Sequence, residues 1–303
     1  MRALRDFIDQ GVSNPRYYFF QRTRALVKFL SNSGEFDRCA ELVLMIHVVE
    51  LNEDLEGRFI DYVRRDVFIN LPTLYAWKFE RSQFKIYIAL RDHEVVGAIR
   101  IGGAGASLTG VKESAEALIE KIRLKNFRLL CPEDLSEEVL KRFSPRKVVK
   151  ILLMVLSKGE EKLYRSREVI DLEPSDASEI SELLRRSSDW WSDYTDDKIL
   201  EMFRRGFSWI GIIRDSRICS IGSFRIMRVD PSLPTIAHIA NIATDSRYRG
   251  RGFATSIISE ILARCFREAD HTILYVEAEN EPAIRLYQKI GFKLHREMTF
   301  ITV

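Results

Sequence analysis

The sequence predicts an α/β (α+β) fold arranged in two domains, residues 1–165 and residues 166–303. At 303 residues the chain exceeds the usual length of one domain. Strand-like and helix-like apolar patterns alternate along it, and each half holds two apolar segments joined by a short polar turn, which is typical of a β-hairpin. Because an Arg-Asp pair stands in both turns, at Arg91 and Arg214, we expect the two domains to share one plan.

The first domain is predicted to begin with helical structure that extends from residue 1 to about residue 66. Apolar residues within 25–30 and 42–49 recur there with the spacing of a helix. The elements expected next are a strand pair at 86–90 and 95–99, a helix at 114–122, a strand at 148–156 and a charged linker at 158–167.

The second domain is predicted to repeat this plan. A helix-start signal, Pro174-Ser175-Asp176, separates its first strand from its first helix. The expected elements are a strand at 169–172, a helix at 180–184, a polar and aromatic loop at 187–194, a helix at 198–203, a hairpin at 208–222, a strand at 236–243, a helix at 253–266 and a strand at 273–276. A last helix is expected from Asn280, a good N-cap, to Gly291, which is placed as a C-cap.

Composition excludes several classes of protein. The net charge of +3 comes from 47 Lys and Arg against 44 Asp and Glu, and the two signs are interspersed, which argues against binding to nucleic acid or to an anionic membrane. No apolar run approaches the roughly 20 residues that span a bilayer, and no apolar signal segment follows the N-terminus, so we expect a cytoplasmic protein. Scattered cysteines and histidines predict no metal site.

The segment Arg247-Tyr248-Arg249-Gly250-Arg251-Gly252 joins a predicted strand to a predicted helix. A helix N-terminus presents free backbone N–H groups, glycines let an anion approach the backbone, and three arginines add mobile positive charge, which together favour a phosphate. The alternative is an ordinary connection with solvated arginines. Two nucleotide-binding loops are excluded, because Thr255 stands where a dinucleotide fingerprint needs glycine, and Phe253-Ala254 stands where a P-loop needs Lys and then Ser or Thr.

At these residues the chain resembles the GNAT superfamily of acyl-CoA-dependent N-acyltransferases. Arg247-x-x-Gly250-x-Gly252 matches the superfamily's coenzyme signature, and a second motif follows at Asn280-x-x-Ala283-x-x-Leu286-Tyr287-x-x-x-Gly291-Phe292. The resemblance implies a mixed, mostly antiparallel central sheet flanked by helices, and acetyl-CoA or another acyl-CoA as the coenzyme. The residues that it assigns to the coenzyme are Ile242, Ala243, Arg247, Tyr248, Arg249, Gly250, Arg251, Gly252, Phe253, Ala254, Asn280, Ala283 and Tyr287.

Tyr287 is the candidate general acid, because the superfamily places a tyrosine at this motif position to protonate the coenzyme A thiolate as it leaves. A neutral phenol with a pKa near 10 suits that step. The alternative is a core aromatic residue, since Tyr287 shares a helix face with Ala283. His238 and Glu277 are the candidate bases for the incoming amine, and each could instead be structural or solvated.

The loop from Ser188 to Asp197 lies where relatives enclose the acceptor. We expect Trp190, Trp191, Asp193 and Tyr194 to bind the acceptor, a cationic amine, by charge and cation–π contact. Helix capping by the aspartates and packing by the tryptophans are the alternative. By resemblance, backbone N–H groups near Asn241 and Ile242 hold the thioester carbonyl, and Asn241 also belongs to the acceptor side.

The first half should carry its own coenzyme turn between Ile99 and Ser107 if it descends from the same fold. Its glycines at 102–105 lack the basic Arg-x-x-Gly-x-Gly pattern, so we expect a degenerate domain without a coenzyme site. Two functions remain open: transfer of an acyl group, most simply acetyl, to a small-molecule or protein amine, and acyl-CoA sensing without turnover. The sequence does not distinguish a monomer from a homodimer.

Overall fold

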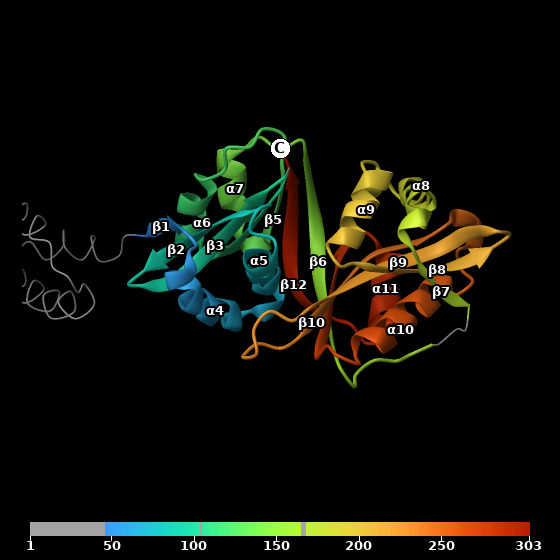
Figure 1. Cartoon of the computed structure of the whole chain (residues 1–303). Coiled ribbons are helices and arrows are strands. Elements are labelled where there is room, and N and C mark those ends of the chain that lie inside the picture. The colour runs from blue at the N-terminus through green and yellow to red at the C-terminus, as the bar shows by residue number, and fades with distance from the viewer. Residues whose placement is uncertain (1–45, 104, 165–167) are drawn as a thin grey trace, which may run out of the picture.

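The structure of the protein is a computed structural model that describes residues 46–103, 105–164 and 168–303 (Figure 1). Its strands are β1 (His47–Glu50), β2 (Lys85–Arg91), β3 (Glu94–Gly102), β4 (Gly105–Gly110), β5 (Arg128–Pro132), β6 (Lys147–Ser157), β7 (Val169–Leu172), β8 (Ser208–Arg214), β9 (Arg217–Met227), β10 (Ile236–Thr244), β11 (His271–Glu277) and β12 (Lys293–Thr302). Its helices are α4 (Glu56–Arg65), α5 (Val67–Phe79), α6 (Lys112–Ile119), α7 (Ser136–Arg142), α8 (Ala177–Ser187), α9 (Asp196–Arg204), α10 (Phe253–Cys265) and α11 (Glu281–Ile290).

The two halves repeat one order of elements. Strand, two helices, three strands, helix, strand, helix and strand run from β1 to β6, and the same series runs from β7 to β12. The β2–β3 and β8–β9 hairpins both turn through two residues with positive φ, Asp92 and His93 in the first and Asp215 and Ser216 in the second. Such turns match the right-handed twist of the strands. The predicted tandem plan is therefore confirmed.

The twelve strands that the described residues form belong to one sheet, and the two halves exchange their last strands at its centre. The strand order is β1-β2-β3-β4-β5-β12-β6-β11-β10-β9-β8-β7. β12 pairs with β5 of the first half, β6 pairs with β11 of the second half, and the two exchanged strands pair antiparallel with each other. In Figure 1 they stand side by side at the middle of the molecule. The sheet therefore continues across the predicted boundary at residues 165 and 166.

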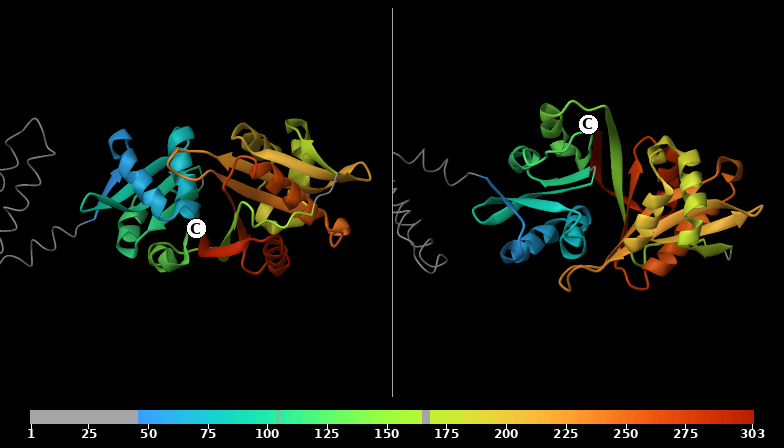
Figure 2. Two further views of the ribbon diagram at one scale, coloured as in Figure 1. Left: turned by 90° about the horizontal axis from the view of Figure 1, so that it is seen from below. Right: turned by 45° about the horizontal axis from the view of Figure 1, so that its top comes forward.

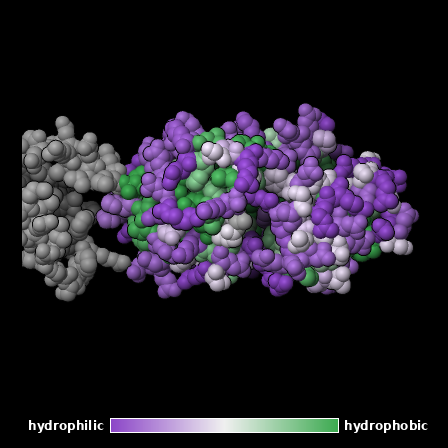
Figure 3. Space-filling view, turned by 90° about the horizontal axis from the view of Figure 1, so that it is seen from above, coloured by the Kyte–Doolittle hydropathy of each residue, from purple (hydrophilic) through white to green (hydrophobic). Residues whose placement is uncertain are grey.

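Helices cover both faces of the sheet in each unit (Figures 1 and 2). In the second unit α10 and α11 pack on one face and α8 and α9 on the other. In the first unit α4 and α5 cover one face, and the core beneath them includes Met227, Ile236 and Ile273 of the second unit. Seen from above, apolar surface gathers on the first unit, whereas the second unit is mainly hydrophilic (Figure 3). No helix of the described residues is both long and apolar enough to cross a membrane.

The helical structure predicted up to about residue 66 is wrong at residues 47–50. Residues His47–Glu50 form β1, which pairs antiparallel with β2 and brings Val48 opposite Ala89. The β-branched pair Val48 and Val49 suits a strand, and the sheet edge overrides the helical spacing. The helix predicted up to about residue 66 is correct for α4, and residues 1–45 lie outside the described residues.

The connection at which a coenzyme turn of the first half was expected, between β3 and β4, belongs to a hairpin. β3 ends at Gly102 and pairs antiparallel with β4, which begins at Gly105, so this connection does not lead into a helix. The strand equivalent to β10 is β4, and only Val111 separates it from α6. The Gly110 backbone lies against Gly97, because a Cβ at Gly110 would come within 2.5 Å of the Gly97 Cα. This connection has no room for an anion-binding loop, so the absence of a basic glycine turn from the described part of the first half is structural.

Candidate active site

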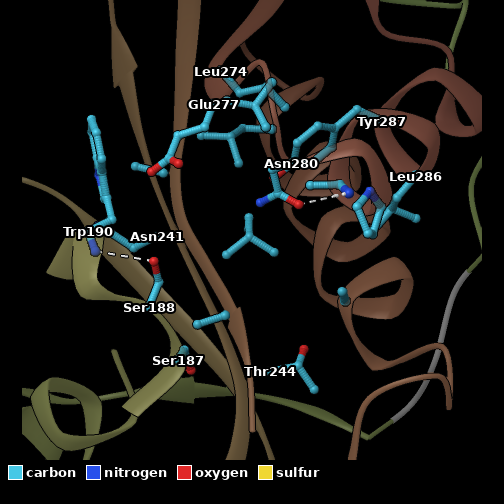
Figure 4. Close-up of a pocket in the computed structure, with 18 of the residues that line it drawn as sticks. Ser187, Ser188, Trp190, Asn241, Thr244, Leu274, Glu277, Asn280, Leu286 and Tyr287 are labelled. Atoms are coloured by element: carbon cyan, nitrogen blue, oxygen red, sulfur yellow. Dashed lines mark hydrogen bonds between the residues drawn. The ribbon is translucent and has the colours of Figure 1, made fainter. Parts of the chain in front are cut away.

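The central feature of the second unit is a cavity of about 910 Å³ between two diverging strands. β10 and β11 pair in parallel only from Ile236 and His271 to His238 and Ile273, and they separate beyond that point. On its other side β10 carries a bulge between Ala240 and Ala243, where Asn241 has a φ of 55°. A bulge leaves backbone N–H groups outside the ladder. The cavity occupies this opening (Figure 4).

Most of the residues predicted for the site line this cavity. They come from the bulged strand, the turn after it, α10, β11, α11 and the loop before α9. The predicted residues in the lining are Trp190, Trp191, Tyr194, His238, Asn241, Ile242, Ala243, Tyr248, Arg249, Gly250, Gly252, Phe253, Ala254, Glu277, Asn280, Ala283 and Tyr287. Arg247, Arg251 and Asp193 do not line it.

The turn before α10 has the backbone of an anion site. Gly250 and Gly252 have φ of 76° and 82°, values that residues with a Cβ rarely adopt. Gly252 is the N-cap of α10, and no side chain caps this helix end. A Cβ at either glycine would meet no atom of the protein, so the requirement for glycine is conformational. The first N–H groups of the 13-residue α10 are therefore exposed to the cavity, with the positive end of the helix dipole behind them.

Two of the three arginines of this turn are held by acceptors of the protein and are not the mobile positive charge that the sequence suggested. The Arg247 guanidinium holds Asp245 through both carboxylate oxygens, at 3.1 and 3.0 Å. This hydrogen-bonded pairing lowers the Asp245 pKa to about 2. Arg249 donates to the carbonyl oxygens of Thr244 and Ser187, at 3.1 and 3.3 Å. Two of the arginines thus brace the turn, because acceptors of the protein already hold their guanidinium groups.

The second motif forms α11, which is capped at both ends. Asn280 Oδ1 accepts a hydrogen bond from the Ala283 N–H at 3.3 Å, and Gly291 ends the helix with a φ of 122°. Tyr287 is 7% exposed, and its ring meets Phe292 edge-on with centroids 5.9 Å apart. No described residue forms a hydrogen bond with the Tyr287 hydroxyl. Burial raises the pKa of this phenol well above its usual value of 10, so it stays protonated near neutral pH.

The two candidate bases occupy different environments. His238 lies between Phe207 and Tyr275, with ring centroids 6.1 and 5.7 Å away. Burial, together with the charges of Arg225 and Arg100, lowers the His238 pKa to about 3. Glu277 is half-buried at the end of β11 and is the only carboxylate among the described residues that line the cavity. Its lowered pKa makes His238 a weaker proton acceptor than an ordinary imidazole, which leaves the half-buried carboxylate of Glu277 as the candidate base.

The loop before α9 contributes aromatic rings to the cavity but no carboxylate. Asp193 binds Arg128 at 3.0 Å and Lys198 at 3.1 Å. Asp196 accepts a hydrogen bond from the Ser181 hydroxyl. Asp193 thus lies outside the lining and is already paired with two cations of the protein, so its predicted recognition of a cationic acceptor stays a prediction. Trp190 instead packs on Phe300, with ring centroids 4.9 Å apart.

The lining also contains residues that sequence reasoning missed. Ile151 of β6 and Phe300 of β12 reach the cavity from the exchanged strands, Leu130 reaches it from β5 beside them, and Tyr275 reaches it from β11. No local motif marks them, because their position depends on how distant strands pair. Alternating apolar residues could have predicted strands there, but not which strands meet the cavity.

A model described as the Acetyltransferase (GNAT) family matches residues 177–292, the stretch that contains the turn, the diverging strands and α11. These residues form a GNAT domain. A tandem GNAT protein from the clavulanic acid biosynthesis pathway covers 86% of this chain and 98% of its own, with a TM-score of 0.56. Its sequence identity is 14%, so this likeness concerns the fold, in which two GNAT units follow each other.

Curated relatives share shorter segments with the chain. The mycothiol acetyltransferase of Corynebacterium aurimucosum is 39% identical over 61 residues, which cover 20% of this chain and 19% of that protein. The L-amino acid N-acetyltransferase AaaT of Escherichia coli is 35% identical over 65 residues, 20% of this chain and 40% of the relative. The chain thus covers less than half the length of these two relatives.

Proposed function

We propose that the protein transfers an acyl group, most simply acetyl, from acyl-CoA to a primary amine by direct attack within a ternary complex. The observation that carries this proposal is the course of the cavity. It runs from the exposed N-terminus of α10, through the opening between β10 and β11, to the aromatic loop before α9. Figure 4 shows Trp190 and Asn241 on one side of this opening and Asn280, Leu286 and Tyr287 on the other. The names of the curated relatives, all acetyltransferases, favour acetyl-CoA.

The coenzyme is placed by the backbone in this proposal. Its pyrophosphate lies on the N–H groups that follow Gly250 and Gly252, where an anion meets the helix dipole. Its thioester carbonyl lies at the bulge, where the N–H groups of Asn241 and Ile242 can stabilise the oxyanion. In this proposal residues 166–303 are the catalytic domain and residues 1–165 a domain without a coenzyme site.

The proton steps fall to Glu277 and Tyr287. The amine nitrogen attacks the thioester carbon and loses a proton to the Glu277 carboxylate, directly or through one water. The carbon–sulfur bond then breaks, and Tyr287 gives its proton to the leaving thiolate. A phenol whose pKa is raised by burial remains neutral until that charge develops beside it. His238, with a pKa of about 3, is left as a neutral wall of the acceptor side.

Thermal unfolding with and without acetyl-CoA, followed by an assay of CoA release with a panel of primary amines, tests the proposal. A coenzyme at a hundredfold excess over its dissociation constant should stabilise the protein by about 2.7 kcal/mol. Stabilisation together with amine-dependent release of CoA supports catalysis. Stabilisation without turnover of any amine supports the sensing function instead, and a flat melting curve removes both.

A further inference from the structure

We propose that the acceptor is a primary amine that carries a large apolar or aromatic group, and that the first unit helps to form the subsite for this group. This inference rests on the proposed function and specifies its substrate. It starts from the exchange of strands, which brings residues of the first unit to the acceptor end of a cavity whose coenzyme turn belongs entirely to the second unit.

The exchanged strands β6 and β12, together with their neighbours β11 and β5, present one continuous face to the acceptor. Glu277 of β11 stands opposite Ile151 of β6, and Ile151 stands opposite Met298 of β12. Two residues further along, Phe300 of β12 stands opposite Leu130 of β5. Residues that are paired, or two apart on a strand, point to the same side of a sheet. The candidate base and the apolar side chains of β6, β12 and β5 therefore share one face.

This face is apolar and lies at the edge of the cavity. Ile151 is 3% exposed, whereas Leu130, Phe300 and Trp190 are only partly buried and all three line the cavity. Trp190 lies over Phe300 and so forms a side wall above the floor. An ion pair between Arg128 of β5 and Asp193 ties the loop that carries this tryptophan to the first unit. The first unit thus contributes Leu130 and Ile151 to the floor, and its Arg128 contacts the loop that carries the wall.

The described residues of the lining offer one anionic side chain, which does not suit an acceptor that carries a second cation. Among the described lining residues Glu277 is the sole carboxylate, and its proposed role is to take the proton of the attacking amine. A second ammonium group that packs on isoleucine, leucine and aromatic rings would lose its hydration without gaining an anionic partner, which costs free energy. An apolar or aromatic group gains from the same contact.

Steady-state acetylation of matched amines by the full chain tests this inference. 3-Methylbutylamine and 2-phenylethylamine carry apolar groups, whereas 1,4-diaminobutane has similar length and ends in a second ammonium. With saturating acetyl-CoA we expect kcat/KM for the two apolar amines to exceed that for 1,4-diaminobutane by about tenfold or more. Peptides that begin with Phe or Lys extend the comparison to chain ends. Preference for Phe supports the inference for a peptide acceptor, and preference for Lys or for 1,4-diaminobutane overturns it.

Variants of the floor separate this inference from the proposed function. Phe300→Ser and Leu130→Ser should lower the apolar-to-dication ratio about tenfold, and Ile151→Val, which removes one methyl group, should lower it a few fold. Val148→Ser is the control, because Val148 is 47% exposed on β6 and does not line the cavity. All four should keep the thermal shift with acetyl-CoA. An unchanged ratio in folded floor variants refutes the subsite while the function stands, and loss of the shift and of all turnover in the unmodified protein refutes the function itself.

Discussion

Replacing Tyr287 by phenylalanine removes one oxygen atom and tests the proposed acid directly. The ring keeps its contact with Phe292, and the hydroxyl has no partner among the described residues, so packing is preserved. We expect the free energy of unfolding to change by less than about 1 kcal/mol. If the phenol protonates the thiolate, the rate of acyl transfer should fall about 10² to 10⁴-fold, which equals about 2.7 to 5.4 kcal/mol of activation free energy.

The assay is CoA release at saturating acetyl-CoA and amine, measured from pH 6 to pH 10. Burial raises the pKa of Tyr287, so the acid form persists below that raised pKa, and we expect Tyr287 to cause no loss of rate up to pH 10. Tyr62→Phe is the matched control, because Tyr62 is a buried tyrosine of the first unit whose hydroxyl bonds Thr109 at 3.0 Å. That variant should lose about 1 kcal/mol of stability and keep its activity. A Tyr287→Phe enzyme with an unchanged rate across this pH range would refute the assignment.

Three further substitutions test the turn, the base and the junction between the units. Gly252→Ala should lower stability by about 1 kcal/mol and weaken acetyl-CoA binding in a titration. Gly57→Ala in α4 is its control: φ is not positive there and an added Cβ would meet no atom within 4 Å, so this variant should be more stable by about 0.4 to 1 kcal/mol. Glu277→Gln should lower kcat about 10² to 10⁴-fold and leave the acetyl-CoA thermal shift unchanged, and an unchanged kcat excludes Glu277 as the base. Glu80→Gln should cost about 3 kcal/mol in urea unfolding, because Glu80 is 6% exposed and binds Arg205 and Arg225 at 3.0 Å; a loss below about 1 kcal/mol contradicts this.

Glu80 also predicts how stability depends on pH. Burial opposes ionisation of this carboxyl, but hydrogen bonds and charges from Arg205 and Arg225 outweigh burial and lower its pKa. Because this pKa is lowered in the folded state, the ion pairs of Glu80 with Arg205 and Arg225 stabilise the fold fully above the ordinary carboxyl pKa. This stabilisation is lost as pH falls through the lowered pKa. The Glu80→Gln variant should therefore show a weaker loss of stability below pH 4 than the unmodified protein.

The features that sequence alone predicted are those whose cause lies within a few neighbouring residues. Gly250 and Gly252 are required where the backbone turns through positive φ, and Asn280 caps the helix that starts beside it. The two hairpins followed from their short polar turns. Such interactions span a few positions, so the pattern of residue types is enough to locate them.

Where the pattern misled, longer-range contacts decided the structure. The helical spacing up to Val49 gave way to pairing with β2, and the arginine of the coenzyme signature, Arg247, is held by Asp245. Asp193 is occupied by Arg128, which lies in the other half of the chain. Neither ion pair can be inferred from a motif, because any exposed acid could pair with many bases.

Sequence by itself predicted that the protein has two units of one plan and that the second carries a basic glycine turn before a helix, whereas the glycines at 102–105 of the first lack this pattern, since those properties depend on local residue types. Tertiary structure alone decided that β12 and β6 change places, and with them which residues form the acceptor side. Pairing between strands depends on burying both faces of the whole sheet at once. For that reason Leu130, Ile151 and Phe300 became part of the site only when the complete sheet was assembled.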